Sequence, residues 1–241
     1  SMLFARVDDT ADICSRTNKC KYMGFLSGEQ AVAVRNYLEK RNVKFNLFGG
    51  YEGAERQMLV YLPDYLEVNF LYEEDAPLVC LRATFFNGDT PSHRDFLGAL
   101  MGEGITRETV GDICVGQGQC DFFVTAEIAP YILQNFTGAG RTKVHLERIP
   151  LREVSVPEAQ KKEIRDTVAS LRLDSIISSG FRIGRSAAAQ YVTAGKVAID
   201  GLPCEKPDKT VAEGSKVSVR GLGKIKLENI NGQTKKGRIS V

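Results

Sequence analysis

The sequence has few of the residues from which metal and redox sites are built. It contains no tryptophan and only two histidines, His93 and His145, among its 241 residues. Its six cysteines form no C-x-x-C pair, and their spacings match no common zinc pattern. We therefore expect no metal and no other cofactor, and we expect the cysteines to remain reduced, structural thiols.

Long apolar segments are missing as well. No run approaches the roughly 20 apolar residues that a transmembrane helix needs, and we expect no signal peptide at the start of the chain. Ser1 ahead of Met2 is interpreted as a residue left by removal of a tag. The sequence thus predicts a cytoplasmic protein that has no membrane partner.

Positive charge is concentrated toward the end of the sequence. The net charge of the whole chain is only +2, but residues 171–241 carry 13 Lys and Arg against 6 Asp and Glu, a net charge of +7. Residues 1–170 hold the other 19 basic and 24 acidic residues, a net charge of −5. This separation favours a polyanionic partner for the C-terminal segment.

Sequence patterns predict an α+β protein made of four parts. They are an N-terminal α/β region (1–72), a central domain (73–152), a linker (153–170) and a C-terminal domain (171–241). In the first part, Ser27 and Gln30 have the spacing of a capping box, so a helix is expected to begin there. A glycine-rich turn follows at residues 48–56. Its residues Gly53, Glu55 and Arg56 either contact a partner or form a simple turn with a surface ion pair.

The central domain alternates predicted strands and helices. Its β-forming segments are 78–86, 110–115, 120–124 and 143–149. Helices are expected after the capping residues Ser92 and Thr125. The resulting order, strand-helix-strand-strand-helix-strand, is that of a ferredoxin-like or RRM-like plait. Because no RNP-type run of strand aromatics is present, we expect four phenylalanines to lie in the core: Phe85, Phe86, Phe122 and Phe123.

The last two parts are predicted to contain three helices and a small sheet. Residues 159–170 have the charged pattern of a connecting helix. A short helix over 173–178 is expected to end at Gly180 in a left-handed cap, and a second helix should cover 185–194. Strand segments follow at 196–199, 216–220 and 224–227, and Asp200-Gly201 is a strong hairpin-turn signal.

A group of basic and polar residues surrounds the start of this second helix. Ala188, Tyr191 and Val192 share an apolar face, which leaves Arg185, Ser186 and Gln190 outside it. Backbone N–H groups and the helix dipole at a helix N-terminus favour phosphate, and arginine can bind phosphate oxygens bidentately. The predicted RNA-binding residues are Arg182, Arg185, Ser186, Gln190 and Lys196, supported by Arg172, Arg220 and Lys224. We expect them to recognise the backbone and shape of structured RNA.

Three motifs in this segment resemble the S4 RNA-binding domain. They are Arg172-Leu173-Asp174, the run from Phe181 to Gln190, and the run from Gly195 to Gly201. The chain departs from the S4 pattern mildly, with Gly184 for a common Ser, Val192 for Ile and Asp200 for Asn. Within this resemblance, Asp174 is interpreted as a helix cap.

Further segments resemble the bacterial YlmH family. They are Gly49 to Arg56, Pro91 to Met101 and Gly111-Asp112-Ile113. The resemblance implies an N-terminal region, an RRM-like central domain and a C-terminal S4 domain. It also implies rRNA and tRNA as partners on the large ribosomal subunit, with a quality-control protein as a further partner, during alanine tailing of stalled chains.

Two other function classes compete with a non-catalytic RNA-binding protein. The first is an RNA-modifying enzyme, because S4 domains often accompany catalytic modules; however, Gly116-Gln117-Gly118 lacks the third glycine of a cofactor loop, and no Walker A motif is present. His93 falls on an apolar helix face and is interpreted as packing. The second is a tRNA-directed or protein-directed adaptor with a basic tail. We expect no catalytic residue and no enzyme.

Overall fold

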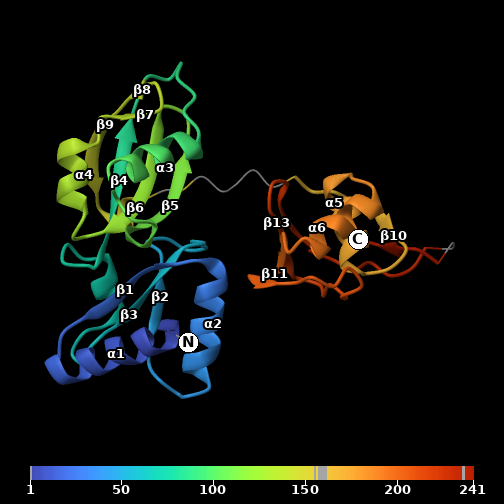
Figure 1. Cartoon of the computed structure of the whole chain (residues 1–241), viewed down its shortest axis with the longest axis horizontal. Helices are drawn as coiled ribbons and strands as arrows, with labels where there is room; N and C mark the ends of the chain where they lie inside the picture. The colour runs from blue at the N-terminus through green and yellow to red at the C-terminus, as the bar shows by residue number, and fades with distance from the viewer. Residues whose placement is uncertain (1, 155, 157–161, 235–236) are drawn as a thin grey trace. The chain divides into compact units, whose positions relative to one another are not determined.

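The computed structural model of the chain describes residues 2–154, 156, 162–234 and 237–241. These residues form two compact units, which cover 1–159 and 160–241 (Figure 1). Each unit has its own hydrophobic core and is described separately.

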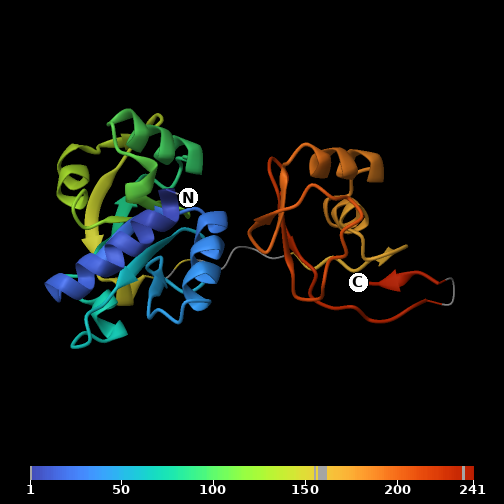
Figure 2. The same cartoon turned by 60° about the horizontal axis from the view of Figure 1, so that its bottom comes forward.

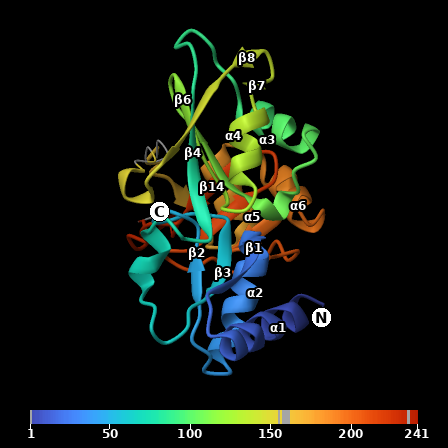
Figure 3. The same cartoon turned by 90° about the vertical axis from the view of Figure 1, so that its left-hand side faces the viewer.

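The first unit begins with a three-stranded antiparallel sheet in the order β1-β3-β2. Its strands are β1 (Lys21–Leu26), β2 (Asn46–Phe48) and β3 (Gln57–Tyr61). Helices α1 (Met2–Thr17) and α2 (Gly28–Glu39) cover one face, as Figure 3 shows. The predicted capping box is confirmed: Gln30 N–H donates to Ser27 Oγ, and Ser27 N–H donates to the Gln30 side chain.

Helix α1 was not predicted. Val7 and Cys14 are buried in it, and Leu3 and Ala11 pack against the same core, so its apolar residues do recur at helical spacing.

A second antiparallel sheet, in the order β5-β6-β4-β9, follows in the same unit. Its strands are β4 (Leu78–Thr84), β5 (Val110–Val115), β6 (Gln119–Thr125) and β9 (His145–Ile149). Helices α3 (His93–Gly102) and α4 (Ala129–Asn135) pack on one face of this sheet. The order of elements along the chain confirms the predicted order of strands and helices. Short elements complete the unit: β7 (Gly138–Ala139), β8 (Thr142–Lys143) and 3-10 turns at Val68–Tyr72, Arg107–Thr109 and Leu151–Glu153.

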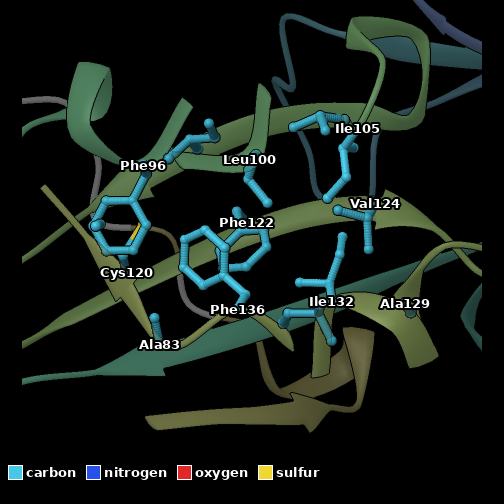
Figure 4. Packing of buried hydrophobic residues seen from close by; sticks show 14 of the residues in the cluster. Ala83, Phe96, Leu100, Ile105, Cys120, Phe122, Val124, Ala129, Ile132 and Phe136 are labelled. Carbon is cyan, nitrogen blue, oxygen red and sulfur yellow. The ribbon is translucent and has the colours of Figure 1, made fainter. Parts of the chain in front are cut away.

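The two faces of the second sheet are buried in different cores. Phe122 packs with Phe96 and Phe136 beneath α3 and α4 (Figure 4). Phe123, one residue later on β6, points to the opposite face and joins Phe25 and Met58 of the first sheet. This is the two-residue alternation of a strand that is buried on both sides.

Three expectations about side chains of the central region need correction or refinement. Phe86 is 76% exposed and is not a core residue, because β4 ends at Thr84 and Phe86 lies in the following turn. Phe85 is only half-buried against the core. His93 is exposed at the first position of α3 rather than packed, although partial desolvation of its ring and then the nearby Arg107 lower its pKa.

The glycine-rich turn joins the two sheets of the first unit. Arg56 is half-buried and donates to three backbone carbonyls, those of Phe25 (3.0 Å), Arg107 (2.9 Å) and Val110 (3.0 Å). Asp112 accepts hydrogen bonds from the Tyr51 hydroxyl (2.8 Å) and from the N–H groups of residues 55 and 56 (2.7 and 3.1 Å). Burial and then the nearby Arg107 lower the pKa of Arg56 to about 10, so it stays cationic at pH 7. Arg56 is therefore an internal clamp and not a surface ion pair.

The second unit pairs two helices with a four-stranded antiparallel sheet. The helices are α5 (Leu173–Phe181) and α6 (Arg185–Thr193), and the sheet has the order β12-β11-β13-β14. Its strands are β11 (Val197–Ile199), β12 (Leu202–Pro203), β13 (Lys216–Val219) and β14 (Gly223–Lys226). Asp200 and Gly201 both have positive φ (50° and 82°), which confirms the predicted hairpin turn.

The ends of this unit are held together by a two-stranded sheet. Strand β10 (Thr167–Val168) pairs with β15 (Ile239–Ser240), and Figure 2 shows the returning C-terminal strand in red. The expected connecting helix is therefore wrong over residues 162–170, and residues 159–161 lie outside the described part. Strand partners some 70 residues apart leave no local sequence pattern, whereas charged residues at helical spacing do.

The cap at the end of α5 also differs from the prediction. The helix continues through Gly180 to Phe181, and the left-handed residue is Arg182, with φ 54° and ψ 43°. Gly180 is needed for a different reason: a Cβ atom there would lie 2.6 Å from the side chain of Ile225 on β14.

Candidate nucleic-acid interface

The turn between α5 and α6 places arginines at the start of a helix. Arg182 follows α5, and α6 begins at Arg185 after Gly184, whose lack of a side chain leaves the N-cap position without a side-chain hydrogen bond. The first-turn N–H groups of α6 therefore keep their capacity to bind an anion. Ser178 Oγ donates to the carbonyl of Ile183 (2.7 Å) and fixes the turn.

A single carboxylate links the S4-like R-L-D motif to this turn. Asp174 accepts from Nε and Nη2 of Arg172 (3.2 and 3.1 Å) and from Nε and Nη2 of Arg185 (3.1 and 3.4 Å). Burial opposes the charge on Asp174, but the hydrogen bonds from the two arginines outweigh it and lower its pKa. The expectation that Asp174 caps α5 is wrong, because no side-chain hydrogen bond caps that helix.

An open hollow lies beside this carboxylate. Arginines from three segments line it, namely Arg182, Arg185 and Arg238, together with Ser175, Ser178, Ser179 and Asp166. Hydrogen bonds to Asp166, first from Ser179 Oγ (2.6 Å) and then from the N–H of Thr167, lower the pKa of that carboxyl. The hollow is thus lined by cations, hydroxyls and one ionised carboxylate, together with the apolar residues Val168, Ala169 and Ile183.

Arg238 was not among the predicted site residues. Its Nε donates to Thr167 Oγ1 (3.0 Å) and its Nη2 donates to the Thr167 carbonyl. Pairing of β15 with β10 brings it to the hollow. The basic character of the C-terminal segment was the only signal for it in the sequence, since its neighbours in space are distant along the chain.

Helix α6 carries two further predicted RNA-binding residues, Ser186 and Gln190. Ala188 and Val192 are buried and Tyr191 is half-buried, as expected from the spacing. Ser186 and Gln190 are exposed. The helix therefore has the predicted division into an apolar and a polar face.

The other three predicted cations are carried by the sheet and its turns. Arg220 N–H donates to the carbonyl of Lys196 (2.8 Å), which brings these two residues together. The Lys196 ammonium lies 5.6 Å from the centre of the Tyr191 ring. Lys224 is exposed on β14, opposite Ser218 of β13. The structure thus joins Arg172 and Arg185 through Asp174, places Arg182 and Arg185 on one hollow, and brings Lys196 next to Arg220.

The net charges of the two units differ more than those of the segments 1–170 and 171–241. Residues 160–241 contain 16 Lys and Arg against 8 Asp and Glu, a net charge of +8, and residues 1–159 contain 16 against 22, a net charge of −6. A hollow in the first unit is lined by Tyr51, Glu52, Tyr72 and Arg152, among others, and its arginine pairs with Glu73 (3.0 Å). Cations converge on the hollow of the second unit instead.

In the described part of the chain, no group of three or more His, Cys, Asp or Glu side chains is placed to hold a metal ion. Among these residues, no helix combines the length and apolar character needed to cross a membrane.

Comparisons with known proteins agree with the motifs in the sequence. Residues 171–217 match the S4 domain, and residues 88–153 match a family described as "Putative RNA-binding domain in YlmH". The chain is 32% identical over 221 residues to ribosome-associated protein quality control protein P2 of Bacillus subtilis (strain 168), covering 91% of this chain and 85% of that protein.

A solved structure supports the fold. The cell division protein ylmH from Streptococcus pneumoniae matches with a TM-score of 0.53 and 16% identity, over 63% of this chain and 91% of that one. At this identity the match shows the fold alone. The matched domains and the extensive identity to the Bacillus protein establish that this chain belongs to the YlmH family of S4-domain RNA-binding proteins.

Proposed function

We propose that this protein is a non-catalytic RNA-binding factor of the large ribosomal subunit. It binds rRNA and tRNA there and assists quality control of stalled peptidyl-tRNA, with alanine tailing as the process served. The observation that carries the proposal is that Arg172 and Arg185 share the Asp174 carboxylate, while Arg182 and Arg185 line one hollow at the open start of α6. The name of the Bacillus relative supports the ribosomal setting, and that setting is cytoplasmic.

The chemistry of the group suits an RNA backbone. Arginine presents a planar fork that matches phosphate oxygens, and the N-terminus of α6 adds backbone donors. A-form RNA hides its base edges in a narrow major groove, so backbone and 2′-hydroxyl contacts dominate recognition. Exposed Ser186 and Gln190 are suited to hydroxyl contacts, while Lys196, Arg220 and Lys224 widen the basic surface.

The domain arrangement is part of the proposal. Residues 73–152 form an RRM-like plait that follows the N-terminal region 1–72. Residues 153–170 lead to the S4 domain at 171–241, and within them β10 belongs to the second unit through its pairing with β15. The strand order β5-β6-β4-β9, with both helices on one face, supports the plait.

Co-sedimentation with purified ribosomal subunits tests the function. Wild type should travel with the large subunit, and the Arg182→Ala/Arg185→Ala variant should remain at the top of the gradient, most clearly at the higher of two salt concentrations. Circular dichroism of both proteins controls for folding. Equal sedimentation of both proteins would contradict the assigned surface, and binding to free tRNA without ribosomes would favour a tRNA-directed adaptor or a subunit of an RNA-modifying enzyme.

A further inference from the structure

Asp174 accepts hydrogen bonds from two of the arginines, but its own negative charge is repelled by RNA phosphates. Only 7% of its side chain is exposed, whereas 42% of the Arg172 side chain and 51% of the Arg185 side chain are exposed. The carboxylate is therefore beneath the surface on which the two guanidinium groups lie.

Four hydrogen bonds fill the acceptor positions of the Asp174 carboxylate. A carboxylate offers about four acceptor positions, two on each oxygen. Oδ1 accepts from Arg172 Nε and Arg185 Nη2, and Oδ2 accepts from Arg172 Nη2 and Arg185 Nε. Each oxygen thus holds one donor from each arginine, and the arrangement fixes both guanidinium planes at once.

The same four bonds use the same edge of each arginine. A guanidinium has five N–H donors, and here Nε and Nη2 each direct one N–H to Asp174. Both N–H groups of Nη1 and the second N–H of Nη2 remain on the outer edge. That edge carries two parallel donors, the geometry that binds two phosphate oxygens.

We propose that Asp174 is a positioning residue for RNA binding, which holds the inner edges of Arg172 and Arg185 so that their outer edges face backbone phosphates. The inference rests on the proposed RNA-binding function and adds a residue whose own charge is repelled by RNA. A long arginine side chain loses rotamer freedom when it is ordered. Because Asp174 orders both arginines in the folded protein, RNA meets side chains that are already in place.

Positioning and simple electrostatics predict opposite results for one substitution. Asp174→Asn removes a negative charge from a phosphate-binding surface, so electrostatics alone predicts tighter binding. If Asp174 positions the arginines, binding instead becomes weaker although the protein is more positive. Asp200→Asn is the matched control, because it makes the same charge change at a left-handed hairpin position that asparagine tolerates.

The experiment measures affinity for bulk tRNA over a range of salt concentrations. We expect Asp174→Asn to bind about tenfold more weakly than wild type, with a salt slope shallower by about one phosphate contact. Asp200→Asn should bind as tightly as wild type or more tightly. Equal affinities of the two variants, or a tighter Asp174→Asn protein, would overturn the inference; a wild type that does not bind tRNA or ribosomes would overturn the proposed function itself.

An NMR measurement on the wild type decides the case even where Asp174→Asn fails to fold. The Nε–H signals of Arg172 and Arg185 should be protected from exchange before RNA is added and should remain so in the complex. The Nη signals should shift on binding. Loss of Nε–H protection with RNA would show that the arginines leave Asp174, and that result would refute a positioning role.

Discussion

The two units use arginine in opposite ways. In the first, Arg56 donates to three backbone carbonyls and Arg82 forms two bonds of 2.7 Å with Asp121, whose side chain is 3% exposed. In the second, Arg172 and Arg185 share one carboxylate and keep about half of each side chain in solvent. Arginine that ends among internal acceptors stabilises the fold, and arginine that keeps an outer edge is available to a partner.

The net charges follow the same division. The first unit has a net charge of −6 and the second a net charge of +8. An acidic unit is repelled by an RNA backbone and a basic unit is attracted to it. Each unit contains a matched domain that is associated with RNA. The two units nevertheless differ in how strongly their net charge attracts phosphate.

Salt should reveal this difference with the largest effect. If the second unit neutralises three to five phosphates, its affinity for RNA should fall roughly 40- to 500-fold between 50 and 200 mM salt. Filter binding or fluorescence anisotropy with tRNA measures the slope for the full chain. The Arg182→Ala/Arg185→Ala variant should give a shallower slope, and a flat profile for wild type would contradict a phosphate-based interface.

Breaking the internal clamp should change stability and leave RNA affinity intact. Arg56→Met keeps much of the apolar stem but leaves three half-buried carbonyls without their donor, a loss of about 3 kcal/mol at about 1 kcal/mol per hydrogen bond. Chemical denaturation measures the loss.

The exposed Arg35 on α2 provides the control for that substitution, since Arg35→Met makes the same chemical change at the surface. It should cost less than about 0.5 kcal/mol. Weaker RNA binding by the folded Arg56→Met protein would mean that the first unit also contacts RNA, and the contrast between the units would fail.

Sequence patterns predicted the features that depend on neighbouring residues. The capping boxes at Ser27 and Ser92 and the hairpin turn at Asp200 involve residues at most three positions apart, and all are present. The helix-strand order of the central region follows from local periodicity in the same way. The S4 motifs likewise located the C-terminal domain, because residues 171–217 match the S4 domain.

The features that were missed depend on distant partners. Arg238 reaches the hollow only through the β10–β15 pair, and Gly180 is explained by Ile225 on another element. Asp174 has a position typical of a helix cap, but Arg185, eleven residues later, supplies a better partner. Periodicity carries no information about such contacts, because they depend on how separate elements pack.

The smallest predicted effect concerns Arg182, where stability and binding should change in opposite directions. Its left-handed backbone (φ 54°) is strained for any residue with a Cβ atom and not for glycine. Arg182→Gly should therefore raise the free energy of unfolding of the second unit by about 0.5 to 1 kcal/mol, while RNA binding weakens severalfold because one cation is lost. Arg220→Gly removes the same charge at a residue whose φ is negative, so it should weaken binding without the gain in stability. Equal melting temperatures for the two variants would show that the left-handed cap stores no strain, and unchanged tRNA affinity of Arg182→Gly would remove Arg182 from the interface.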